Sequence, residues 1–123
     1  MDHRLYLAAR ARVLADLSAL SRATPDLVSA LEDAVESRRW WAEQWPEGEI
    51  YVAGLVAQDV QDAAIDLGQR WPVCPSCGDA PEHALHIHPD LGGPDPVWVC
   101  EESGAEVAEL GRLSGPGRAG PTT

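Results

Sequence analysis

The chain has 123 residues, 45% of them hydrophobic, and a formal net charge of −11. This length suffices for one domain, or for a helical part with a small metal-stapled lobe. No apolar run approaches the ~20 residues of a membrane helix, and the N-terminus lacks the apolar block and cleavage site of a signal peptide. We therefore expect a protein without membrane contact.

The negative charge is concentrated towards the C-terminus. Residues 1–45 carry seven acids against six arginines, a net −1, and residues 46–72 carry a net −4. Residues 73–123 carry eight acids against two arginines, a net −6. Direct binding of nucleic acid requires cationic surface that displaces counterions. We therefore expect no direct contact with DNA or RNA.

The first predicted helix covers residues 2–20. Its apolar residues recur at steps of three and four, which places them on one face. These residues are Leu5, Ala9, Val13, Leu17 and Leu20. The charged side chains of Arg10, Arg12 and Asp16 are expected beside or opposite that face.

A second helix is predicted to begin at Thr24, the N-cap, with Pro25 at its first position and Asp26 in its first turn. Five residues stripe its apolar face: Leu27, Leu31, Ala34, Val35 and Trp41. The helix is expected to end at residues 46–48, which read Pro-Glu-Gly.

The third segment begins at Ile50. Residues 50–56 alone would suit a buried strand, but they continue into residues 57–64 without a turn signal, which favours a helix. Leu67 and Gly68 are a plausible C-terminal stop for it.

Short strands are predicted after Pro72. One lies near residues 83–88, a turn spans residues 90–96, and a second strand at Val97–Val99 leads into Cys100. Residues 107–110 are expected to add a third strand. Residues 114–123 are too polar and too rich in glycine and proline to fold, so we expect a disordered tail.

All three cysteines and three of the four histidines lie within residues 71–104. The motif Cys74-Pro75-Ser76-Cys77-Gly78 has the spacing of a zinc knuckle, and thiolates with imidazoles are the ligands of a tetrahedral zinc site. Three cysteines cannot all pair with one another, and their clustering favours a reducing cytoplasm over secretion. The sequence therefore predicts Zn²⁺ as cofactor and a cytoplasmic location.

The segment of about residues 72–110 resembles a zinc ribbon, a hairpin held by two knuckles of the form C-x-x-C-G. The first knuckle matches fully, but the second, Cys100–Gly104, has Ser103 where the ribbon has its fourth cysteine. The pattern is also similar to that of small uncharacterised proteins of high-GC bacteria, which show a His-x-Leu element. His83-Ala84-Leu85 occupies that element here. With serine at the fourth position, either a histidine replaces the missing cysteine or the site has lost its metal, and the three nearby histidines favour replacement.

Hairpin geometry narrows the choice of histidine. With the turn centred near residues 92–93, Cys100 lies opposite about Leu85, so His83 and His86 are within a residue or two of the metal. His88 is displaced by about 10 Å at strand rise. We predict Cys74, Cys77, His83 and Cys100 as the metal ligands, with His86 as the alternative to His83.

Two catalytic uses of these cysteines compete with the structural one. Cys74 and Cys77 could form a redox pair, but such a motif opens a helix, and residues 78–81, Gly-Asp-Ala-Pro, cannot continue one. A zinc deaminase needs proline directly before the first cysteine and an upstream H-x-E, whereas Val73 precedes Cys74 and the only upstream histidine is His3. The acids near the knuckles are expected to be solvated.

The five tryptophans are the second unusual feature, because the chain has no phenylalanine. Trp40, Trp41 and Trp45 lie on the second helix, while Trp71 and Trp98 belong to the cysteine-rich segment. We expect these rings to pack between the helices and the hairpin. The alternative is that Trp40 is an exposed anchor for a partner protein.

The sequence thus predicts an α+β protein in which a three-helix unit, residues 1–70, packs with a zinc-ribbon-like β-hairpin lobe, residues 71–113. The expected role is a non-enzymatic zinc-binding module for protein interaction. One alternative is a factor associated with nucleic acid or transcription that acts through protein contacts or as an acidic mimic. The other is a thiol oxidoreductase using Cys74 and Cys77.

Overall fold

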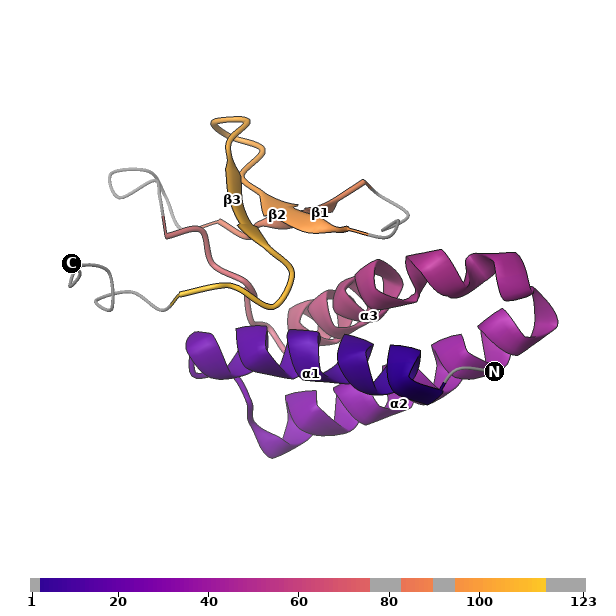
Figure 1. The fold of residues 1–123 in the computed structure, drawn as a ribbon. Helices are drawn as coiled ribbons and strands as arrows, with labels where there is room; N and C mark the ends of the chain where they lie inside the picture. Colours follow the sequence, from indigo (N-terminus) through magenta and orange to yellow (C-terminus); the bar gives the residue numbers. More distant parts are fainter. Residues whose placement is uncertain (1–2, 76–82, 90–94, 115–123) are drawn as a thin grey trace.

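The computed structural model describes residues 3–75, 83–89 and 95–114 and has the predicted α+β architecture. Three α-helices come first: α1 (His3–Ala19), α2 (Pro25–Gln44) and α3 (Val52–Asp66), with the 3₁₀ helix η1 (Pro46–Tyr51) between the last two. The strands β1 (His86–His88), β2 (Val97–Val99) and β3 (Glu106–Glu109) follow. Figure 1 shows the strands on one side of the helices, above α1 and α3.

The start of α2 is as predicted. The Leu27 N–H donates to the Thr24 hydroxyl at 3.4 Å, and Pro25 takes the first helical position, where no hydrogen-bond donor is needed. The end differs from the expected simple stop at residues 46–48. The chain instead winds through η1, so Ile50 and Tyr51 precede α3 rather than belong to it.

The third segment is a helix, and it stops where the sequence indicates. Gly68 has a φ of +76°, and the Gln69 N–H donates to the Ala64 carbonyl at 2.9 Å. A residue in the left-handed region with a hydrogen bond back to the last turn is a common helix end, and glycine adopts it without strain.

The sheet is antiparallel in the order β1-β2-β3. His86 pairs with Val99 and His88 with Val97, a register that continues to Leu85 opposite Cys100, as the hairpin argument expects. The third strand begins one residue earlier than predicted, at Glu106. Most of the predicted turn at 90–96, and the predicted tail beyond Ser114, lie outside the described residues.

One apolar core is shared by the helices and the strands. Trp71 and Trp98 are fully buried and pack edge to face, with ring centroids 5.4 Å apart, and they belong to one core cluster with residues of all three helices. Such rings bury a large apolar area and so contribute strongly to the packing of the strands on the helices. The packing expectation is correct for these two rings and wrong for Trp40 and Trp45, which are 64% and 46% exposed.

Asp16 lies in this core, which corrects the expectation that it lies beside or opposite the apolar face. Its carboxylate is buried and accepts hydrogen bonds from the Trp98 indole at 2.8 Å and from the backbone N–H groups of Gly111 at 2.7 Å and Leu113 at 3.0 Å. The Asp16 carbonyl also accepts from the Trp71 indole at 3.2 Å. A buried carboxylate is tolerated because these donors replace water.

A second polar contact links the helices to the sheet. The Gln61 side chain, buried on α3, donates to the Leu85 carbonyl at 2.6 Å. Together with the bonds to Asp16, this contact fixes the edge of the sheet on the helices and so positions the segment that carries His83. Within the described residues, no helix combines the length and the apolar character that crossing a bilayer requires.

Candidate metal centre

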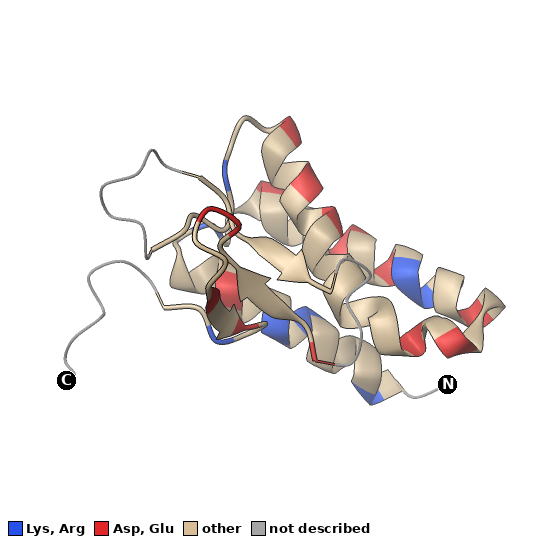
Figure 2. Ribbon diagram, turned by 90° about the horizontal axis from the view of Figure 1, so that it is seen from above, with Lys and Arg blue, Asp and Glu red and all other residues tan. Residues whose placement is uncertain are grey.

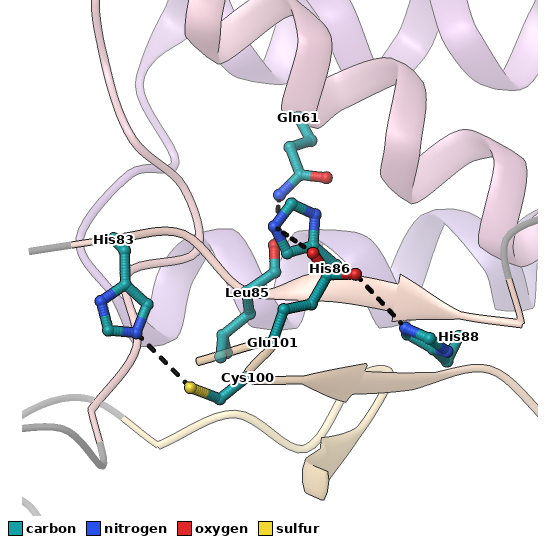
Figure 3. Close-up of polar contacts among 7 residues, drawn as sticks. All are labelled: Gln61, His83, Leu85, His86, His88, Cys100 and Glu101. Carbon is teal, nitrogen blue, oxygen red and sulfur yellow. Dashed lines mark hydrogen bonds and ion pairs between the residues drawn. The ribbon is translucent and has the colours of Figure 1, made fainter. Parts of the chain in front are cut away.

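Cys74, His83 and Cys100 come together beside the sheet. Their ligand atoms all lie within 4.8 Å of one another, and His83 Nε2 is 3.5 Å from Cys100 Sγ (Figure 3). The three residues come from three separate stretches of chain. Among the residues that the structure describes, no other group of three cysteines, histidines or acids is as compact.

Backbone pairing brings the first two residues side by side. Val73 forms an isolated antiparallel bridge with Ala84, in which the Cys74 N–H donates to the His83 carbonyl at 2.9 Å and the Leu85 N–H donates to the Pro72 carbonyl at 2.8 Å. This pairing extends the sheet edge beyond β1. The position of His83 beside Cys74 therefore follows from main-chain hydrogen bonds.

Cys100 is held by a tight turn at the end of β2. The Gly104 N–H donates to the Cys100 carbonyl at 2.7 Å, and the Cys100 N–H donates to the Ala105 carbonyl at 2.9 Å. Gly104 has a φ of +78°, which glycine accepts without strain. Ser103 is used within this turn, where its hydroxyl accepts from the Ala105 N–H at 3.3 Å, and it is not part of the cluster.

The distances suit a tetrahedral metal. Zinc bonds of about 2.3 Å to sulfur and about 2.0–2.1 Å to nitrogen place neighbouring ligand atoms about 3.5–3.8 Å apart in a tetrahedron. The separation of 3.5 Å between His83 Nε2 and Cys100 Sγ falls in this range. Cys100 is buried, whereas Cys74 and His83 are half-buried, so the cluster lies at the boundary between core and solvent.

Of the four ligands predicted from the sequence, the structure brings together Cys74, His83 and Cys100. Cys77, the second cysteine of the knuckle, lies outside the described residues. In the sequence it follows Cys74 by three residues.

His86 and His88 lie away from the cysteines. They alternate with the buried Ile87 along β1, and their side chains are half exposed on the opposite face. Their Nε2 atoms are 3.4 and 3.6 Å from the two carboxylate oxygens of Glu101. This contact was not predicted from the sequence. Two signals were present: the His-x-His pattern of residues 86–88, and the acid directly after Cys100 at the end of the paired strand.

The architecture defines a small α+β protein with a cysteine–histidine cluster at the edge of its sheet. The chain belongs to the DUF8819 family, described as a domain of unknown function, whose model matches residues 2–110. The match spans the helices and the sheet, so the family is defined by both parts. No curated protein and no solved structure matches the chain.

Proposed function

We propose that the protein is a non-enzymatic zinc-binding module for protein interaction, in which one structural Zn²⁺ is held by Cys74, Cys77, His83 and Cys100. The observation that carries the proposal is the convergence of two thiols and one imidazole within 4.8 Å. Soft sulfur and borderline nitrogen donors in this number select zinc among common divalent ions. Thiols available for metal suit a reducing compartment, and we propose the cytoplasm.

The metal is assigned a structural role because four protein ligands leave no open coordination position. A catalytic zinc keeps one position for water or substrate. The ligands also join chain segments that have little core of their own, since β1 and β2 have three residues each. Zinc binding to such a site contributes directly to the free energy of folding.

Metal analysis of protein purified from a reducing lysate tests this proposal. We expect about one equivalent of zinc per chain in the wild type and faster loss to a chelator in His83→Ala, because one of the four ligands is removed. His88→Ala is the matched control and should retain zinc. Faster loss in His86→Ala alone would show that the ligand is misassigned. Metal-free, folded protein that reduces a disulfide substrate through Cys74 would favour the oxidoreductase alternative.

A groove along α2 supports the interaction part of the proposal. It is shallow, has a volume of about 700 Å³ and is lined by Asp33, Glu36, Ser37, Trp40 and Trp41. Within the described part of the chain, Asp33 and Glu36 form no ion pair, whereas Arg38 on the same helix is neutralised by Asp59 at 2.8 Å. The groove therefore presents uncompensated negative charge beside an exposed indole ring.

The occupant that fits this groove is a basic segment of a partner protein. A lysine or arginine side chain gains a cation–π contact on Trp40 and ion pairs with the two carboxylates. A second copy of this chain is a poor occupant, because each copy carries a net charge of −11 and has no lysine. Figure 2 shows acidic positions on the helices and on the sheet, so the field around the whole molecule favours cationic partners.

Binding of a synthetic arginine- and lysine-rich peptide, followed by tryptophan fluorescence, tests the groove. Two double variants that remove the same number of charges distinguish binding in the groove from non-specific attraction to an acidic protein. Asp33→Asn with Glu36→Gln should abolish most of the binding, and so should Trp40→Ala, whereas Glu102→Gln with Glu106→Gln on the exposed lobe should not. Equal losses of binding in both double variants would mean that the peptide binds through the net charge of the protein and not in the groove.

A further inference from the structure

A second cluster of ligating side chains lies on the solvent face of β1. His86 and His88 flank Glu101, and Figure 3 shows the carboxylate between the two imidazole rings. The three side chains are between 46% and 56% exposed. None of them belongs to the cysteine cluster, which lies on the other side of the same strand.

The backbone presents these side chains together. Alternation along β1 puts His86 and His88 on one face, with the buried Ile87 between them. Glu101 directly follows Cys100, and the hydrogen bond from the Gly104 N–H to the Cys100 carbonyl closes the turn that carries it. The backbone therefore fixes the positions of the three Cα atoms, and only the exposed side chains can rotate.

We propose that His86, His88 and Glu101 form a second divalent-metal site, selective for ions that accept imidazole, such as Zn²⁺, Co²⁺, Ni²⁺ and Cu²⁺. Two metal-bound atoms, one nitrogen and one oxygen, lie roughly 3.4 Å apart when each bond is about 2.0–2.1 Å long. The His86 nitrogen lies 3.4 Å from one Glu101 oxygen and the His88 nitrogen lies 3.6 Å from the other, so each imidazole–carboxylate pair has this spacing. Unlike those of the cysteine cluster, the three ligand atoms do not all lie within 4.8 Å of one another in the structure.

Binding requires the two rings to turn towards each other around the carboxylate. Their exposure leaves room for this rotation, since neither side chain is packed in the core. The surrounding charge favours a cation, because the segment of residues 73–123 carries a net −6. Hard ions such as Mg²⁺ are disfavoured, because two of the three donors are nitrogen.

The second site differs chemically from the cysteine site. It offers no sulfur, its three protein ligands leave at least one position open to water or to a partner's side chain, and it lies in solvent. We therefore expect it to exchange its metal readily. The site does not require the cysteine cluster to be filled, so the two proposals can fail separately.

Calorimetric titration of the zinc-loaded full chain with Co²⁺ tests the site. The wild type should bind one further equivalent without the intense charge-transfer absorption that thiolate ligands give to cobalt. His86→Gln and His88→Gln should each weaken this binding by at least roughly tenfold, the lower end of the loss caused by removing even an outer-shell partner. His3→Gln, an exposed histidine on α1, is the matched control and should bind as the wild type does.

Failure to fold does not confuse the result, because both histidines are half exposed and their variants should keep the wild-type melting temperature. The proposal is overturned if the wild type takes up no second equivalent, or if the His86 and His88 variants still bind it. If the cysteines hold no zinc, the same titration of the apo protein still reports the second site. Cobalt bound without thiolate absorption, and lost in His86→Gln, would support it there.

Discussion

Asp16 is a single residue on which the two parts of the molecule depend. Its two carboxylate oxygens accept three hydrogen bonds, all from residues between Trp98 and Leu113. Burial raises the pKa of Asp16 above its usual value, and the hydrogen bonds from Trp98, Gly111 and Leu113 oppose this rise without cancelling it. The buried carboxylate therefore binds a proton more readily in the folded protein than in the unfolded chain.

We expect Asp16→Asn to lower the free energy of unfolding at pH 7 by about 1–3 kcal/mol, as for a buried hydrogen-bonding group left unsatisfied. The amide keeps one acceptor oxygen, but its NH₂ group then faces a backbone N–H donor. Urea unfolding of the wild type and the variant measures the difference. Asp62→Asn, on the exposed side of α3, is the control and should change stability little.

The sign of the pH dependence follows from the raised pKa of Asp16. Below the unfolded pKa of about 3.9 the carboxyl is protonated in both states, and its favourable contribution is fully present. As the pH rises through the folded pKa the folded state loses its extra proton, and that contribution is lost. The stability advantage of the wild type over Asp16→Asn should therefore shrink as the pH increases above about 4. An advantage that grows with pH would contradict the assignment.

At the scale of single elements, the turn η1 is shaped by an aromatic cluster. Trp41 and Trp45 meet edge to face at 5.3 Å, and Trp45 stacks on Tyr51 at 6.1 Å. Gly48 lies beneath these rings, and a Cβ atom there would approach Trp41 to 2.7 Å and Trp45 to 2.8 Å. The absence of a side chain at Gly48 lets the chain pass under the indoles into α3.

Gly48→Ala should destabilise the protein by about 1–3 kcal/mol, because the added methyl group overpacks two rigid rings. Thermal unfolding measures this loss, and the tryptophan emission should change with it because the indoles must shift. Trp40→Ala is the control, since Trp40 lies near this end of α2 but is exposed. An unchanged melting temperature for Gly48→Ala would mean that the rings move aside without cost.

The contact between α3 and β1 couples helix packing to the metal cluster. Gln61→Leu would leave the Leu85 carbonyl without its side-chain donor, two residues from His83. We expect a loss of about 1–2 kcal/mol, together with faster release of zinc to a chelator because the His83 segment is less fixed. Gln44→Leu, exposed at the end of α2, is the control. Zinc release as slow as in the wild type would separate this contact from the metal site.

Much of this element structure could be predicted from the sequence, because it depends on local patterns. The spacing of Leu5, Ala9 and Val13, the cap at Thr24 and the glycine at Gly68 each act within a few residues of themselves. The strand Val97–Val99 and its register followed from the position of the turn. The start of α3 was misplaced because η1 is shaped by the rings of Trp41 and Trp45 packing over Gly48, and this side-chain packing has no recognisable helix or turn pattern.

The candidate cluster was predictable only in part, because some of its supporting contacts join residues that are distant in the sequence. Cys74 and Cys100 were recognisable by residue type, and the hairpin register reduced the candidate histidines to His83 and His86. The role of Asp16 could not be found in this way, although it lies three residues from Val13 and four from Leu20. A charged side chain on an apolar face is normally placed at its edge, and its donors are distant in sequence at Trp98, Gly111 and Leu113.

For the whole molecule, the shared core predicts that metal removal is felt by the helices. Trp71 and Trp98 are fully buried among residues of α1, α2 and α3. We expect a chelator to lower the temperature of one cooperative transition, with the helical circular dichroism and the near-ultraviolet tryptophan signal lost together. A helical signal that outlasts the tryptophan signal would show that the two parts unfold separately.

The hydrogen bonds to Asp16 also set the order in which the chain can finish folding during its synthesis. The helices leave the ribosome first, but the apolar face of α1 then carries a carboxylate whose donors at Trp98, Gly111 and Leu113 have not yet been made. Domains usually fold as units, the N-terminal one first. In this protein Asp16 gains its three donors only once residue 113 has emerged, so we expect α1 to reach its final packing only after the sheet has formed.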